Sequence, residues 1–413
     1  MLESMAAPQA RGKKSNDVIF GASAAAKADI AKNGAEAVTD ATIGAILDEE
    51  GRLVCLPVVE ETYREIPMAD LIAYAPVAGL PAYLKDVEAC CFEEWRPKGF
   101  TSAVSTAGGT GALHHVIHNY SEPGDEILTA DWYWSAYRTL CEDNGRHLRT
   151  FRMLNDAGHF DATDFKRQLS AMAERQVQLV VVINTPAHNP TGYSLTDRDW
   201  DGVIDFLKQL TTQGKRIVLL IDVSYIDYAG PGAKEFFRKL EGLPEEILVV
   251  IAFSLSKSFT LYGQRIGAMI ALSSNAWIAE EFVEINTYTN RATWSNNCRG
   301  AMECFIRIWE NPVKRAAWKS EQQAYYHLIR ERADIFMKEA RDVALPVLPY
   351  QAGYFISVPL KNSKAVCEYL HRDHIYLVPL SAGARLAVCA VPKKKMHGIA
   401  QKLKAAMEVC GEI

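Results

Sequence analysis

Short apolar runs alternate with amphipathic stretches along the middle of the chain. Strands that alternate with helices in this way are typical of βαβ units, in which helices cover a mostly parallel sheet. The pattern therefore predicts an α/β fold. The predicted strands are rich in β-branched residues: TSAVST (101–106), DEILTA (125–130), QLVVVIN (178–184), RIVLLID (216–222) and ILVVIAF (247–253).

The pattern changes at Pro312. A long helical pattern runs from there to about Arg341, and three shorter apolar runs and a closing helix rich in Lys and Ala follow. These features predict a smaller α+β domain. Since no Pro/Gly/Ser-rich linker is long enough to separate independent domains, we expect the two domains to interleave.

Composition narrows the class of protein. At roughly 150 residues per domain, 413 residues predict two to three domains, and 49% hydrophobic with 23% charged residues is typical of globular proteins. A net charge of −5 argues against a nucleic-acid or membrane partner. No apolar run has the length of a membrane span, no signal-peptide pattern is visible, and the nine cysteines form no CxxC pair. We therefore expect a cytoplasmic protein.

Polar residues at the ends of the predicted strands are the first candidates for a site, because open α/β sheets bind ligands beyond the carboxyl ends of their strands. The first strand leads into AGGTG, where glycines allow close backbone approach and a helix begins. Gly108, Gly109 and Thr110 therefore suit a phosphate, although for this segment taken alone a plain tight turn is the more common explanation. Asn189, in AHNPTG, is either a ligand contact or a turn residue.

Two further strand ends carry charge. Asp222 ends a buried apolar run and Tyr225 follows it, and a buried carboxylate must meet a cation or several donors. In SLSKSFTLYGQRIG, Lys257 is either part of an ion pair or a Schiff-base amine, and Arg265 adds a second cation. A carboxylate for a ring nitrogen, a lysine for an aldehyde, and backbone amides with an arginine for a phosphate together match pyridoxal phosphate.

With these residues the chain resembles the fold type I, class I pyridoxal-phosphate aminotransferases that act on aspartate and aromatic amino acids. The resemblance implies a mostly parallel, seven-stranded-type sheet flanked by helices and a smaller α+β domain. It divides the chain into residues 1–50 (N-terminal arm and part of the small domain), 51–312 (large cofactor-binding domain) and 313–413 (C-terminal small domain). The matching segments are DVIFGASAAAKAD, DEEG, AHNPTG, IDVSY, SLSKSFTLYGQRIG and GARLAV.

The resemblance assigns roles around the cofactor. It makes Lys257 the covalent attachment point, places Asp222 beneath the ring nitrogen, and places Asn189 and Tyr225 at the 3-oxygen. Trp134 is expected to stack on the ring, with ordinary core packing as the alternative. The expected phosphate contacts are Gly108, Gly109, Thr110, Ser254, Arg265 and Tyr74, the last from a neighbouring subunit. Tyr74 therefore implies a homodimer with shared sites.

The resemblance also assigns a substrate site. Arg385 is expected to pair with the α-carboxylate, beside Trp134, Asn189 and an entrance at Gly44. Arg291 is expected to cross the dimer interface to a distal carboxylate, unless it is an ordinary surface arginine.

Three departures from the family pattern stand out. Gly108 replaces a residue that often bears a hydroxyl, and Tyr137 and Asn184 replace two histidines that often support the aspartate. The residues after Arg291 also differ, so the choice of substrate is the least transferable inference. The grouped His114, His115 and His118 show no third ligand pattern, and we expect no metal.

The implied activity is transfer of an amino group from aspartate or an aromatic amino acid to 2-oxoglutarate by a ping-pong mechanism. A β-lyase or decarboxylase on the same fold is the alternative, because fold alone does not fix the reaction. A regulatory ligand sensor on the same fold is the alternative that is not an enzyme, and no basic helix-turn-helix pattern favours it.

Overall fold

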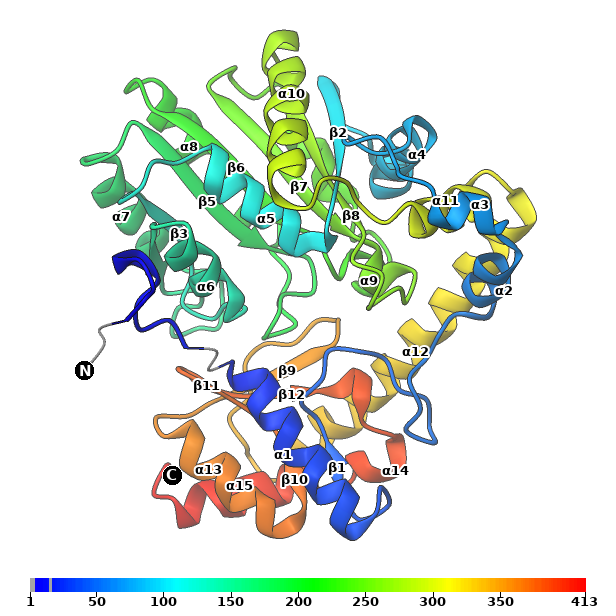
Figure 1. Cartoon of the computed structure of the whole chain (residues 1–413). Coiled ribbons are helices and arrows are strands. Elements are labelled where there is room, and N and C mark those ends of the chain that lie inside the picture. The colour runs from blue at the N-terminus through cyan, green and yellow to red at the C-terminus, as the bar shows by residue number, and fades with distance from the viewer. Residues whose placement is uncertain (1–3, 15–16) are drawn as a thin grey trace.

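A seven-stranded sheet forms the centre of the larger part of the molecule (Figure 1). The structure is a computed structural model that describes residues 4–14 and 17–413. The strand order is β2-β8-β7-β6-β5-β3-β4, and only β8 runs antiparallel to its neighbours. The strands are β2 (Phe100–Thr106), β3 (Glu126–Ala130), β4 (His147–Phe151), β5 (Gln178–Asn184), β6 (Arg216–Asp222), β7 (Ile247–Ser254) and β8 (Gly267–Ser273).

The predicted mostly parallel α/β sheet is confirmed, and all five predicted strands are present. Two strands were not predicted, each for a physical reason. β4 is an edge strand whose sequence, HLRTF, is mostly polar and only partly buried. β8 is fully buried, but its sequence, GAMIALS, is rich in small residues rather than in β-branched ones.

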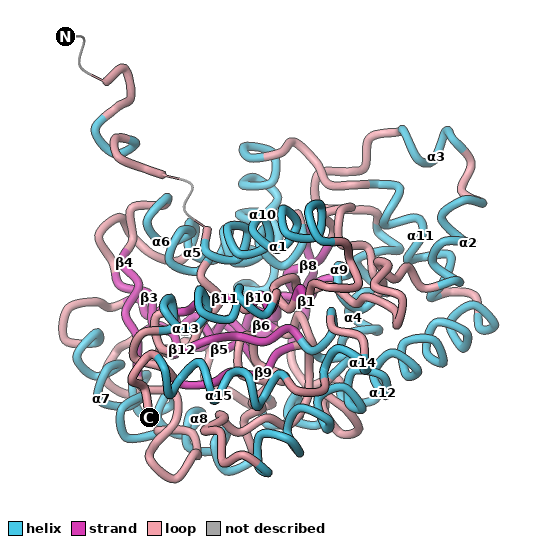
Figure 2. Tube along the Cα trace, turned by 90° about the horizontal axis from the view of Figure 1, so that it is seen from below, coloured by secondary structure: helices cyan, strands magenta, loops and turns pink. Residues whose placement is uncertain are grey.

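Both faces of the sheet are buried, which explains the continuous apolar runs. Leu179, Val181 and Ile183 of β5 belong to the core beneath α7 and α8, whereas Val180 and Val182 belong to the core beneath α5 and α6. Figure 2 shows the strands between these two helical layers. The helices of this part are α2 (Pro57–Glu65), α3 (Met68–Ile72), α4 (Pro81–Phe92), α5 (Gly108–Asn119), α6 (Ala136–Asp143), α7 (Ala162–Ala173), α8 (Asp197–Thr211), α9 (Leu255–Ser258), α10 (Ala276–Thr293) and α11 (Arg299–Trp309).

The smaller part has an antiparallel sheet in the order β11-β12-β9 and a parallel pair, β1-β10. The 31-residue helix α12 runs between the two parts (Figure 1). The long helix, the short strands and the closing helix all lie where the sequence predicts them. The elements are α1 (Val18–Asn33), β1 (Thr39–Asp40), α12 (Pro312–Asp342), β9 (Phe355–Pro359), α13 (Ser363–Leu370), β10 (Ile375–Tyr376), β11 (Val378–Leu380), β12 (Gly383–Ala387), α14 (Lys393–Met396) and α15 (Ile399–Val409).

The core of the smaller part combines distant segments of the chain. Ala41 and Ile46 pack in one cluster with residues of α12 and the C-terminal elements. Arg332 of α12, which is fully buried, donates to the carbonyl oxygens of Leu47 (2.9 Å) and Cys389 (2.8 Å). The segment before α2 is therefore fixed beside the strands that follow α12. The domain limits at residues 50 and 312 remain a prediction.

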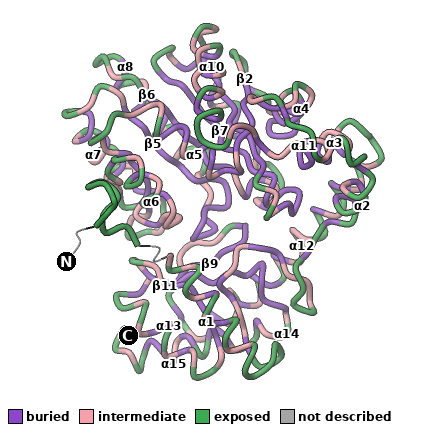
Figure 3. The backbone as a smooth tube through the Cα atoms, in the orientation of Figure 1, coloured by how far each residue is buried: buried purple, intermediate pink, exposed green. Residues whose placement is uncertain are grey.

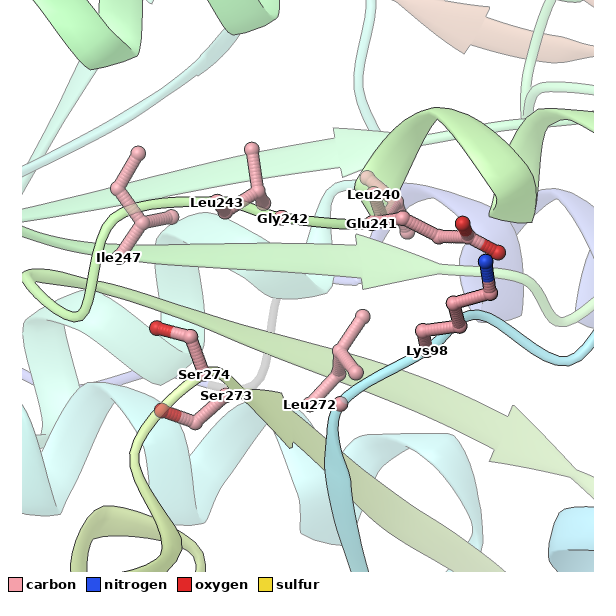
Figure 4. A pocket seen from close by; sticks show the side chains of 10 residues that line it. Lys98, Leu240, Glu241, Gly242, Leu243, Ile247, Leu272, Ser273 and Ser274 are labelled. Carbon is pink, nitrogen blue, oxygen red and sulfur yellow. The ribbon is translucent and has the colours of Figure 1, made fainter.

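Exposure follows the layers, with buried strands inside and exposed outer helix surfaces (Figure 3). Across residues 4–14 and 17–413, no helix combines the length and the apolar character needed to span a membrane. A cavity of about 410 Å³, lined by Lys98, Leu243 and Leu272 among others, opens where β7 begins and β8 ends (Figure 4). That edge of the sheet is opposite to the one where Asp222 and Ser254 end their strands.

Candidate active site

Several of the predicted site residues lie together at the carboxyl ends of the central strands. Asp222 ends β6, Lys257 lies in α9 directly after β7, and α5 begins two residues after β2. These ends face β9 and β12 of the smaller part (Figure 1), and β12 contributes Arg385. The site is therefore built from both parts of the molecule.

The amine of Lys257 lies in an enclosed aromatic environment. Its Nζ donates a hydrogen bond to the carbonyl oxygen of Gly44 and lies 5.0 Å from the ring centroid of Tyr262. Burial lowers the pKa of Lys257 to about 8, and the positive charges of Arg265 and Arg385 act in the same direction. A lysine with this pKa is partly unprotonated near neutral pH, as a nucleophilic amine must be.

Gly44 is fixed by close packing. A Cβ atom at this position would lie 2.7 Å from Cζ of Phe355, so a side chain would push that ring away. The glycine predicted at the entrance therefore lies directly at the lysine, and its carbonyl oxygen is the contact.

The carboxylate of Asp222 is buried and accepts three hydrogen bonds. Oδ2 accepts from the hydroxyl of Tyr137 (2.7 Å), and Oδ1 accepts from the amide (3.1 Å) and hydroxyl (2.6 Å) of Ser224. Burial raises the pKa of Asp222, while the bonds from Ser224 and Tyr137 oppose that rise. Tyr137 therefore contacts the carboxylate directly at a position where the family often has histidine.

Asn184, which replaces the second histidine of the family pattern, bonds to backbone groups rather than to the carboxylate of Asp222. Its Nδ2 donates to the carbonyl oxygen of Asp222 (2.8 Å), and its Oδ1 accepts from the backbone N–H of Asn189 (2.6 Å). The Nδ2 of Asn189 donates to the hydroxyl of Tyr225 (3.4 Å). These bonds join the end of β6 to the loop that carries Asn189.

Arg385 is almost fully buried, with 2% of its surface exposed, and is incompletely paired. Nη1 donates to Oδ1 of Asn189 (3.1 Å) and Nη2 to the carbonyl oxygen of Thr42 (2.7 Å), but Nε has no partner within the described chain. Burial lowers the pKa of Arg385 to about 10. A buried guanidinium that has unused donors, and that pairs with no carboxylate among the described residues, is suited to an anionic ligand.

The start of α5 is the candidate phosphate site. The N-cap residue, Ala107, makes no side-chain hydrogen bond to the helix, so the first N–H groups of α5 are available to an anion. Arg265 lies against this turn, and its Nη1 donates to the hydroxyl of Ser256 (3.0 Å). Gly109 lies close to Ser254, because a Cβ atom at Gly109 would lie 3.6 Å from Cβ of Ser254. Thr110 is half-buried in the first turn of the helix.

The departure at Gly108 has a steric reason. Its φ is +67°, and a Cβ atom there would lie 2.5 Å from Nη2 of Arg265. The guanidinium thus occupies the space that a side chain at Gly108 would need. Arg265 has a positive φ as well, +50°, so both sides of this contact depend on an unusual backbone conformation.

Trp134 lies beside the site and is half-buried. Its ring meets that of Tyr137 edge to face, with centroids 5.9 Å apart. The position is adjacent to the residue that contacts Asp222, so stacking on a cofactor ring stays a prediction that the geometry allows.

Tyr74 and Arg291 are not brought to Lys257 by their own chain. Tyr74 is 87% exposed, and Arg291 is exposed with its Nη1 donating to the hydroxyl of Ser295 (2.6 Å). Their roles therefore stay predictions that require a second subunit.

Asn290 was missed by the sequence analysis and connects the segments of these two residues. Its Nδ2 donates to the carbonyl oxygens of Val77 (3.1 Å) and Ser105 (2.8 Å), and its Oδ1 accepts from Nε1 of Trp294 (3.1 Å). No pattern marks an asparagine inside a helix for such a role. Ser224 was also missed, although a serine two residues after an aspartate is a recognisable turn signal.

The histidine group has a structural explanation. His115 is fully buried, shares a 3.0 Å hydrogen bond with Asn290 and stacks on Trp294 with centroids 5.7 Å apart. Burial lowers its pKa to about 4, so the ring is neutral at physiological pH. Within the part of the chain that the structure describes, no three His, Cys, Asp or Glu side chains are grouped as metal ligands.

Comparisons with known proteins agree with this geometry. The model of the family described as aminotransferase class I and II matches residues 37–403. The crystal structure of an aminotransferase from Anaerococcus prevotii is 34% identical, with a TM-score of 0.95 and coverage of 98% of this chain and 99% of that one.

Two further relatives are more distant. An aromatic-amino-acid aminotransferase from Burkholderia pseudomallei, covalently bound to pyridoxal phosphate, has a TM-score of 0.79 and 22% identity, with 97% of this chain and 100% of that one covered. The cytoplasmic aspartate aminotransferase of Caenorhabditis elegans is 25% identical over 385 residues, which are 88% of this chain and 89% of that protein.

A side chain at Gly108 is expected to weaken the phosphate site rather than to restore a missing hydroxyl. In Gly108→Ser the new Cβ displaces Arg265, and we expect the affinity of the cofactor-free protein for pyridoxal phosphate to fall about ten-fold, the equivalent of about 1.4 kcal/mol. Fluorescence titration measures this affinity.

Gly124→Ala is the matched control, because Gly124 also has a positive φ (+95°) but no atom within 4 Å of its Cβ position. It is expected to lose stability without losing affinity. Unchanged or tighter binding by Gly108→Ser would show that Arg265 does not need this space.

Proposed function

The chain belongs to the family of class I and II aminotransferases and is a pyridoxal-phosphate-dependent transaminase, and from this premise we propose its substrates and the roles of its residues. It transfers the amino group of aspartate or of an aromatic amino acid to 2-oxoglutarate by a ping-pong mechanism. The observation that carries the proposal is Arg385, a buried and incompletely paired arginine whose positive charge acts on Lys257, a lysine whose pKa is lowered to about 8.

The residues of the site fit the three reactive parts of pyridoxal phosphate. Lys257 offers an amine, Asp222 a buried carboxylate with unused acceptor capacity, and the start of α5 with Arg265 an anion site. When bound, the cofactor supplies an aldehyde that bonds covalently to amines and a ring that withdraws electrons from the Cα of the bound amino acid.

The protein's own groups bind the substrate and move its proton. Arg385 binds the α-carboxylate through the donors that the protein leaves free and so directs Cα toward Lys257. Nζ of Lys257 would take the proton from Cα and deliver it to C4′, the cofactor carbon that carries the aldehyde, as the amino group is transferred. Asp222 would keep the ring nitrogen protonated, and Asn189 with Tyr225 would hold the 3-oxygen of the ring.

The dimer and the distal carboxylate belong to the same proposal. Met68 (66% exposed), Ile72 (73%) and Tyr74 (87%) present apolar surface on and just after α3, as expected of a face that a second subunit covers. Asn290 holds the Tyr74 segment beside the helix end that carries Arg291. Both residues then enter the partner's site, where Arg291 binds the distal carboxylate of aspartate, glutamate or 2-oxoglutarate.

A lyase or decarboxylase remains the second candidate, but two arginines that hold both carboxylates of a substrate favour transamination.

All nine cysteines are free thiols, which supports a reducing compartment such as the cytoplasm.

A panel of amino donors with 2-oxoglutarate tests the substrate proposal. In Arg291→Leu we expect kcat/KM for aspartate to fall about thirty-fold or more, the equivalent of about 2 kcal/mol, because a charge pair with the distal carboxylate is lost. Phenylalanine carries no distal carboxylate and is expected to lose little.

Arg64→Leu is the control for loss of an exposed arginine, since among residues 4–14 and 17–413 Arg64 pairs with exposed Glu60 one helical turn away and with no other acidic residue. Equal losses for phenylalanine and aspartate in Arg291→Leu would show that Arg291 does not bind the side chain, and Arg299 would be the next candidate.

Shared sites predict complementation between two inactive or weakened variants. A mixed dimer of Lys257→Ala and Tyr74→Phe subunits has both defects in one site and none in the other. Random exchange at equal concentrations should therefore give wild-type sites at about one quarter of the total. Activity that stays at the average of the parents, with subunit exchange verified by mass spectrometry, would contradict the shared site.

A further inference from the structure

The three hydrogen-bond donors around Asp222 fill some acceptor positions of its carboxylate and leave a defined number of positions for a ligand. An ionised carboxylate has about four acceptor positions, two on each oxygen. Ser224 fills both positions on Oδ1 with its amide and hydroxyl, and Tyr137 fills one on Oδ2. Within the described residues one acceptor position therefore remains open, and it lies on Oδ2.

Tyr137 is placed rigidly enough to select that position. Its side chain is 1% exposed at the start of α6, and the ring of Trp134 packs edge to face against it. The hydroxyl has one proton, which it donates to Oδ2 at 2.7 Å. Burial and the negative charge of Asp222 raise the pKa of Tyr137 well above 10, so the phenol stays a donor at physiological pH.

The other groups around Asp222 also keep one protonation state in mildly acidic solution. Facing it are Asn184 from β5, Ser224 and Tyr225 from the segment after β6, and Lys257 from α9. Burial raises the pKa of Tyr225, and that of Lys257 lies near 8. Histidine, with an unperturbed pKa of about 6.5, is the side chain whose charge ordinarily changes between about pH 5 and 8.

We propose that Tyr137 is a positioning residue that, together with Ser224, holds Asp222 in one orientation and leaves a single acceptor position on Oδ2 for the protonated ring nitrogen of pyridoxal phosphate. The inference rests on the proposed role of Asp222. If Tyr137 and Ser224 hold Asp222 in this way, their hydrogen bonds to the carboxylate do not vary with pH in the range where histidine titrates.

The test compares Tyr137→Phe and Tyr137→His with the wild type by titrating cofactor-free protein with pyridoxal phosphate from pH 5.5 to 8. At each pH the dissociation constant of the variant is divided by that of the wild type, so that the ionisations of the cofactor itself cancel. For Tyr137→Phe we expect a ratio of about ten that is constant with pH, because one hydrogen bond to a charged group is lost. For Tyr137→His we expect a ratio that changes with pH as the imidazole titrates.

Tyr193→Phe is the matched control. Tyr193 is also buried and donates to an aspartate, Asp199, at 3.1 Å, but it lies outside the proposed ligand contacts. Its loss is expected to lower the thermal stability of the cofactor-free protein and to leave the dissociation constant unchanged, which separates a positioning role from a general loss of packing.

Asp222→Ala separates the inference from the proposed function. If Asp222→Ala loses affinity while Tyr137→Phe binds as the wild type does, the inference is overturned and the role of Asp222 stands. If Asp222→Ala also binds normally, the proposed role of Asp222 fails. Should Tyr137→Phe not fold, Tyr137→His carries the test, and wild-type affinity at every pH would overturn the inference.

Discussion

The site depends on keeping a lysine amine partly unprotonated inside the protein. Lys257 is enclosed by protein and is influenced by two arginines, Arg265 and Arg385, which disfavour its positive charge. Since the folded protein binds the proton of Lys257 less tightly than the unfolded chain does, this group lowers stability below pH 8, and the cost disappears as pH rises toward the ordinary lysine value. The rest of the fold must offset that cost.

The central sheet brings the residues of the site together around Lys257. Strands buried on both faces bring Asp222, Lys257 and the start of α5 to one edge of the sheet. The smaller part then adds Arg385, and the segment before α2 adds the carbonyl oxygen of Gly44. Arg332 ties that segment to the strands that follow α12, so a contact remote from the chemistry helps to set the position of the lysine's hydrogen-bond partner.

The sequence was informative about polar residues that directly follow buried apolar strands. Asp222 and Lys257 follow runs such as RIVLLID and ILVVIAF, which are apolar throughout because both faces of β6 and β7 are covered. Tyr137 was noted as a departure, but its bond to Asp222 joins residues 85 positions apart, and no periodicity encodes such a contact. The same holds for Asn290, whose partners lie far away in sequence. Tyr74 and Arg291 depend on a second subunit, which the folding of one chain does not position.

The most direct measurement of the central claim is the identity of the lysine that carries the cofactor. The purified protein is loaded with pyridoxal phosphate and reduced with borohydride, and peptide mapping by mass spectrometry locates the modified residue. The account predicts one modified lysine, Lys257, and a visible absorption that disappears on reduction. Stoichiometric modification of any other lysine, with Lys257 unmodified, would contradict it.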